Sequence, residues 1–65
     1  MVNIWKYSNA KDPITITTVD WKKYRGKVID VMPADYDEGA TEDSIVIDCN
    51  GLYEGFSPSE IESIE

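Results

Sequence analysis

The chain has 65 residues, and its apolar content of 42% is enough for one small core, so we expect a single domain over residues 1–65. Thirteen acidic residues against six basic ones leave a net charge of −7, which repels a phosphate backbone and makes nucleic acid an unfavourable partner. One cysteine and no histidine exclude an internal disulfide and suit a reducing, cytoplasmic environment, and no apolar run approaches the roughly 18 residues of a membrane span.

The first predicted strand follows an N-terminal segment of undecided structure. Residues 1–12 form an arm or a strand, and within them Val2 to Tyr7 is expected as a strand, an extended arm or a short turn. Ile14 to Val19 alternates isoleucine with threonine, which is typical of a half-buried strand, and Pro13 lies where a missing N–H does least harm. A polar turn over Asp20 to Lys23 follows.

A long second strand is predicted over Tyr24 to Met32, with Gly26 near its beginning and Pro33 at its end. The two-residue period fails where Val28 and Ile29, both apolar, stand side by side. We expect a bend or β-bulge that brings both side chains to the core, since a sheet that curls into a barrel needs such a bend.

Residues 33–43 are expected to form an acidic, solvated loop. Hard cations prefer several carboxylate oxygens, and this loop supplies Asp35, Asp37, Glu38, Glu42 and Asp43. Counted from Asp35, however, Gly39 falls at the fifth position of an EF-hand loop instead of the sixth, and Val46 falls where the bidentate glutamate belongs. We therefore expect no metal site and no cofactor.

The C-terminal third has the clearest local signals. Ser44 to Cys49 and Leu52 to Phe56 read as two strands joined by Asn50-Gly51, the favoured pair for a type I′ hairpin turn. Ser57 to Glu60 offers a capping serine, a proline at the first helical position and a glutamate three residues after the cap, which predicts one helical or 3₁₀ turn. Ile61 to Ile64 is the expected final strand.

Five short strands with one 3₁₀ turn before the last resemble the small SH3-like barrels, and within them the Sm-like group. The residues that match its first motif are Ile14, Ile16, Tyr24, Gly26, Val28 and Val31, and Ile61 and Ile64 match the end of its second. The likeness implies an all-β, five-stranded barrel. The loop after Met32 lacks the asparagine of that group, and Ser57-Pro58 replaces its Arg-Gly pair. The RNA-binding residues of that group are therefore not matched.

One stretch carries an unusual charge. Four of the six basic residues fall within six positions beside two aromatic residues, and the stretch reads Trp21, Lys22, Lys23, Tyr24, Arg25, Gly26 and Lys27. Such a stretch can grip single-stranded nucleic acid, or it can place cations on the outer face of a strand and discourage edge pairing. Trp21 itself either packs over the barrel end against Trp5 or Tyr7, or anchors an interface.

We expect a non-catalytic binding or assembly module whose partner is a protein, or a second copy that joins through edge strands. The predicted contact surface consists of Trp21, Lys22, Lys23, Tyr24 and Arg25. The predicted core consists of Ile14, Ile16, Val28, Val31, Ile45, Ile47 and Ile61, with Cys49 as a small inward-facing residue. Two alternatives stay open, namely a divergent Sm-like binder of single-stranded nucleic acid and an acidic mimic of nucleic acid.

Overall fold

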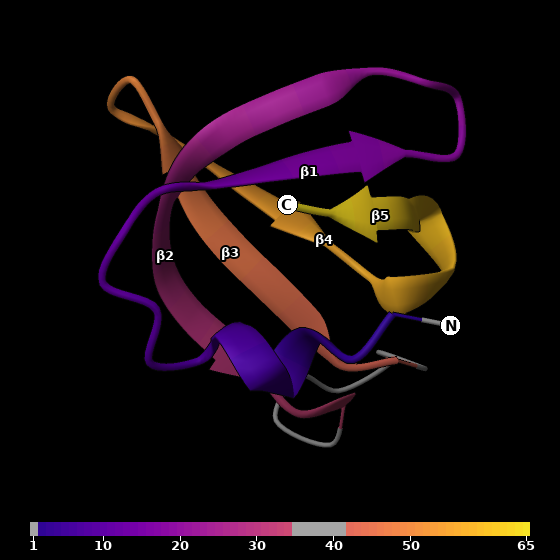
Figure 1. The fold of residues 1–65 in the computed structure, drawn as a ribbon. Coiled ribbons are helices and arrows are strands. Elements are labelled where there is room, and N and C mark those ends of the chain that lie inside the picture. Colours follow the sequence, from indigo (N-terminus) through magenta and orange to yellow (C-terminus); the bar gives the residue numbers. More distant parts are fainter. Residues whose placement is uncertain (1, 35–41) are drawn as a thin grey trace.

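The computed structural model describes residues 2–34 and 42–65 and is an all-β protein with five antiparallel strands (Figure 1). In sheet order they are β4 (Leu52–Phe56), β3 (Ser44–Cys49), β2 (Lys23–Met32), β1 (Ile14–Thr18) and β5 (Ile61–Ile64). The structure confirms the expected all-β class and the predicted bounds of β3, β4 and β5. No ladder between described residues joins β4 to β5, so the sheet stays open there.

Strand β2 is long enough to belong to both halves of the sheet. Its first residues pair with β1 through Gly26, and from Lys27 onward it pairs with β3. A Cβ atom added at Gly26 would lie 2.1 Å from the backbone carbonyl oxygen of Asp48. Strands β2 and β3 therefore approach so closely at Gly26 that only glycine fits.

The expected bulge in β2 is confirmed, because its register with β3 shifts between Val28 and Asp30. Val28 is half-buried and packs against the core. Ile29, in contrast, is 44% exposed, so the expectation that both residues reach the core is wrong. The extra residue of a bulge is left without a ladder partner, and here its side chain faces outward.

Strand β1 lies between β2 and β5 and supplies the centre of the core. Ile16 is fully buried, and the next two residues, Thr17 and Thr18, are buried as well. The register with β5 shifts between these two threonines, and such an irregularity disturbs the strict alternation of faces. Strand β1 ends at Thr18, so Val19, expected as its last residue, lies in the turn and is exposed.

Six of the seven residues expected in the core are buried. Val28 is only partly buried. Two residues outside the expected set complete it: Phe56 at the end of β4, and Ile4, which is 1% exposed. The buried core therefore consists of Ile4, Ile14, Ile16, Val31, Ile45, Ile47, Phe56 and Ile61.

The local turn signals are also confirmed. Asn50 and Gly51 have φ of 54° and 88°, as a type I′ turn requires at both central positions. The 3₁₀ helix η3 (Pro58–Glu60) follows Ser57 and keeps the Glu60 capping contact. Of the three structures expected for the N-terminal segment, the short turn is found, as the 3₁₀ helix η1 (Ile4–Tyr7).

Candidate binding surface at the β1–β2 turn

The turn between β1 and β2 has a backbone geometry that normally favours glycine. The Trp21 amide donates to the Thr18 carbonyl at 2.9 Å, and the Thr18 amide donates to the Lys22 carbonyl at 2.9 Å. Trp21 itself has φ of 66°. These features match a three-residue hairpin loop whose last residue is left-handed, a position where glycine avoids the steric penalty.

The Trp21 side chain is 72% exposed. The alternative that it packs over the sheet against Trp5 or Tyr7 is therefore wrong. Figure 1 shows the reason, because the β1–β2 turn and η1 lie at different ends of the molecule. Trp5 instead donates from its indole Nε1 to the Asp43 carboxylate at 2.6 Å. The left-handed backbone at Trp21 costs about 1–2 kcal/mol, and the exposed ring offsets little of it.

Polar contacts hold this turn in place without the tryptophan ring. The buried Thr18 hydroxyl group donates to the Asp20 carboxylate. This hydrogen bond, together with the Lys22 ammonium 3.8 Å away, lowers the pKa of Asp20 below its ordinary value. The turn therefore keeps its shape through Thr18 and Asp20, while Trp21 projects into solvent.

The structure divides the predicted contact surface in two. Lys23, Arg25 and Lys27 alternate along β2 and are all exposed, and Arg25 donates to the Thr15 hydroxyl at 3.2 Å. They form an outer basic stripe beside Trp21 and Lys22. Tyr24, which lies between the first two of them, is half-buried and does not share this face.

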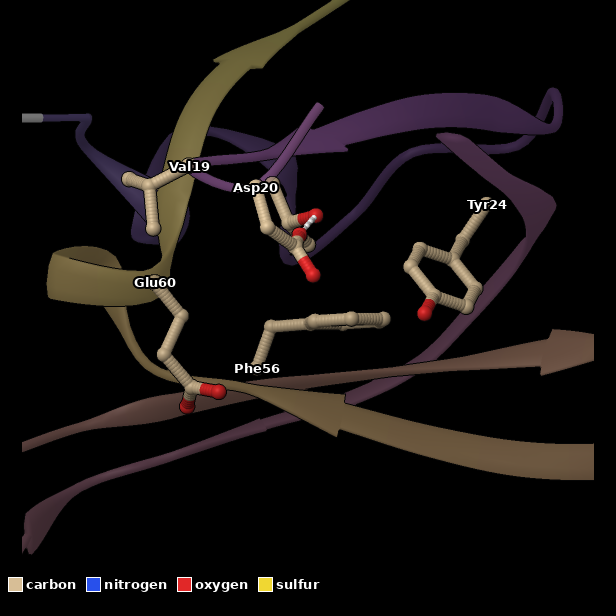
Figure 2. Close-up of a pocket in the computed structure, with 6 residues that line it drawn as sticks. Val19, Asp20, Tyr24, Phe56 and Glu60 are labelled. Carbon is tan, nitrogen blue, oxygen red and sulfur yellow. Dashed lines mark hydrogen bonds between the residues drawn. The ribbon is translucent and has the colours of Figure 1, made fainter. Parts of the chain in front are cut away.

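Tyr24 lines a hollow of about 330 Å³ beside the turn (Figure 2). Its ring lies against that of Phe56, with centroids 5.0 Å apart and planes tilted by 51°. Four segments of the chain supply the lining, which consists of Thr18, Val19, Asp20, Tyr24, Phe56 and Glu60. The sequence did not indicate this site. Two features of the sequence bear on it: strand alternation places Tyr24 on the face opposite Lys23 and Arg25, and Glu60 caps the turn that begins at Ser57.

The two acidic residues of the hollow are held by hydrogen bonds. Glu60 Oε1 accepts the Ser57 amide at 3.1 Å across η3, and Asp20 accepts the Thr18 hydroxyl group. Each contact uses one carboxylate oxygen. Glu60 Oε2 accepts no hydrogen bond from a described residue, so the hollow has acidic groups that remain able to bind a cation.

The acidic loop lies partly outside the described residues, which exclude Asp35, Asp37 and Glu38. Glu42 accepts the Ser59 amide at 3.3 Å, and Asp43 accepts both the Trp5 indole and the Ala34 amide. These donors lower the pKa of Asp43. In the described part of the chain no three metal-binding side chains gather, and no helix there is long and apolar enough to cross a bilayer.

Cys49 is half-buried against the core, in keeping with its expected inward position. Burial, followed by the nearby carboxylates of Glu54 and Asp48, raises the pKa of its thiol. Because the thiolate is the reactive form, this environment lowers the reactivity of Cys49 at neutral pH.

Comparison with known proteins identifies no relative of this chain. No family model matches the chain, and neither the curated proteins nor the solved structures contain a significant match. Assignment of a function therefore depends on the chain's own residues and their geometry.

Proposed function

We propose that the chain is a non-catalytic, cytosolic binding module whose β1–β2 turn contacts a protein partner. The observation that carries this proposal is Trp21, which is 72% exposed in a left-handed backbone conformation. Strained backbone is concentrated at functional sites, and tryptophan is enriched among the residues that dominate binding energy. A bulky, exposed residue at a position suited to glycine has its best explanation in an intermolecular contact.

The strand order supports an SH3-like architecture with Sm-like features. Strand β1 lies between β5 and β2, the 3₁₀ helix η3 joins β4 to β5, and β2 approaches β3 closely at Gly26. Pairing of β4 with β5 would complete a small barrel. Both strands keep an unpaired edge in the described sheet, and such edges are suited to strand addition by a partner or a second copy.

The charge beside Trp21 indicates which kind of partner surface is complementary to it. Lys22, Lys23 and Arg25 follow Trp21 closely in the sequence of a protein of net charge −7, so this stretch is locally basic on an acidic molecule. We expect the partner to offer an apolar pocket for the indole with carboxylates at its rim, because complementary charges guide association and exclude wrong partners.

One observation favours a second candidate, a binder of single-stranded nucleic acid. The basic stripe Lys23, Arg25 and Lys27 lies next to the exposed Trp21, and cations beside a stacking ring are what such binders use. Tyr24 does not contribute, because its half-buried side chain lies on the opposite face of β2 from the stripe. Titration with single-stranded RNA at two salt concentrations tests this. Tight, salt-sensitive binding that Lys22→Glu with Lys23→Glu abolishes would favour nucleic acid over a protein.

The experiment that tests the protein-binding proposal is affinity capture from the host's lysate, with proteins and nucleic acid both quantified. Three baits are compared: the natural chain, Trp21→Gly, and Tyr53→Ala as a control for an aromatic residue that is 66% exposed on β4. We expect one protein to be lost with Trp21→Gly and retained with Tyr53→Ala. Equal capture by the natural chain and by Trp21→Gly would contradict the proposal. Capture of a basic protein that added DNA releases would favour an acidic mimic of nucleic acid.

A further inference from the structure

The hollow beside the β1–β2 turn combines aromatic and acidic side chains from opposite sides. Figure 2 shows the Asp20 carboxylate and the Tyr24 hydroxyl group directed toward Phe56, with Glu60 at the other end of that side chain. Val19, 55% exposed, forms the outer wall. An apolar wall with a carboxylate directed toward it suits a ligand that is itself apolar along its length and cationic at its tip.

Among residues 2–34 and 42–65, no basic residue lines the hollow. The nearest described cation is the Lys22 ammonium, 3.8 Å from Asp20 Oδ2, and this pair is weak because the two side chains are 69% and 60% exposed. An incoming cation that is better desolvated can therefore replace Lys22.

We infer that the hollow binds an arginine side chain presented by the protein partner, an inference that rests on the proposed function. The planar guanidinium group stacks on the Tyr24 ring and donates to Asp20 Oδ2, while its methylene groups contact Val19. Glu60 Oε2 adds a second acidic oxygen at the far end. Lysine fits less well, because its compact ammonium is more strongly hydrated and cannot stack as a plane.

The test uses the ¹⁵N-labelled full chain and a capped peptide, acetyl-Ala-Leu-Arg-Leu-Ala-amide, titrated in an NMR spectrometer. The control peptide carries citrulline, which keeps the shape of arginine and removes its charge. We expect saturable shifts at the amides of Val19, Asp20, Tyr24 and Glu60, with none at Gly51 in the distant hairpin. We expect the citrulline peptide to bind about tenfold more weakly, as the loss of charge-assisted hydrogen bonds implies.

Isosteric variants distinguish binding by the carboxylates of the hollow from a general effect of the protein's charge on peptide affinity. Asp20→Asn keeps an acceptor for Thr18, and Glu60→Gln keeps the η3 cap, so both variants should fold. The double variant is expected to bind the arginine peptide at least about tenfold more weakly. Glu62→Gln and Glu65→Gln together remove the same charge from exposed positions outside the hollow, and this control should change binding less than about twofold.

Equal binding of the citrulline peptide, shifts centred outside the hollow, or an equal loss in the control variant would each overturn the inference. If the arginine peptide does not bind the hollow while capture from the lysate still requires Trp21, the inference is wrong and the proposed function stands. If the peptide binds in the hollow while Trp21→Gly captures as much protein as the natural chain, the proposed contact through the turn is wrong instead.

Discussion

Replacement of Trp21 by glycine is expected to make the protein more stable. The left-handed backbone of Trp21, with φ of 66°, costs about 1–2 kcal/mol for a residue with a Cβ atom. Glycine removes that cost but adds about 0.5–1 kcal/mol of backbone entropy to lose on folding. The ring is 72% exposed, so its loss removes little burial. The net gain is about 0.5–1 kcal/mol, or about 2–8 °C in Tm for a domain of this size.

The matched variant is Trp21→Ala, which removes the indole but keeps the left-handed penalty. Urea denaturation followed by far-ultraviolet circular dichroism measures the free energy of unfolding of all three proteins. We expect Trp21→Gly to exceed Trp21→Ala by about 0.5–1 kcal/mol and Trp21→Ala to lie close to the natural chain. A Trp21→Gly protein less stable than the natural one by 1 kcal/mol or more would show that the ring stabilises the fold, and would refute this reasoning.

Three further changes test the fold. Gly26→Ala places a Cβ atom 2.1 Å from a β3 carbonyl oxygen, so we expect a loss of about 3 kcal/mol or more by urea denaturation, whereas the roomier Gly55→Ala should change stability by less than about 1 kcal/mol. Ile4→Ala removes a side chain that is 1% exposed and should cost about 2–5 kcal/mol; a cost under 1 kcal/mol would place η1 outside the cooperative fold. The lowered folded-state pKa of Asp43 stabilises the protein above the ordinary value of 3.8, and this stability is lost as the pH falls through the folded pKa. Thermal melts between pH 2 and 6 should show a smaller acid-induced fall in Asp43→Asn than in the natural chain, and equal falls would contradict this contribution.

Much of the fold was predictable because its signals are local. The Asn50-Gly51 turn and the Ser57 to Glu60 cap each depend on a few adjacent residues, and they set the bounds of β3, β4 and β5 correctly. Ile4 was missed because one turn of 3₁₀ helix is too short to show a hydrophobic period. Phe56 was placed in its strand correctly, but its burial depends on packing against Tyr24 from β2.

The candidate site was less predictable, since its residues meet only in three dimensions. Trp21 and Tyr24 belong to one predicted surface, yet strand alternation turns Tyr24 toward Phe56 while the turn leaves Trp21 exposed. The left-handed conformation of Trp21 follows from the pairing of Thr18 with Lys22. A shift of one residue in that pairing would have changed which residue occupies the position, and no local pattern determines it.

Site-specific photo-crosslinking tests the central claim, that Trp21 is the point of contact, most directly. Benzoylphenylalanine is placed in one protein in place of Trp21 and in another in place of Tyr53, which is similarly exposed at the β3–β4 hairpin. After irradiation in the host's lysate, mass spectrometry identifies the attached molecules. We predict one protein joined through position 21 and absent from position 53. The same adducts at both positions, or a crosslink only through position 53, would contradict the account.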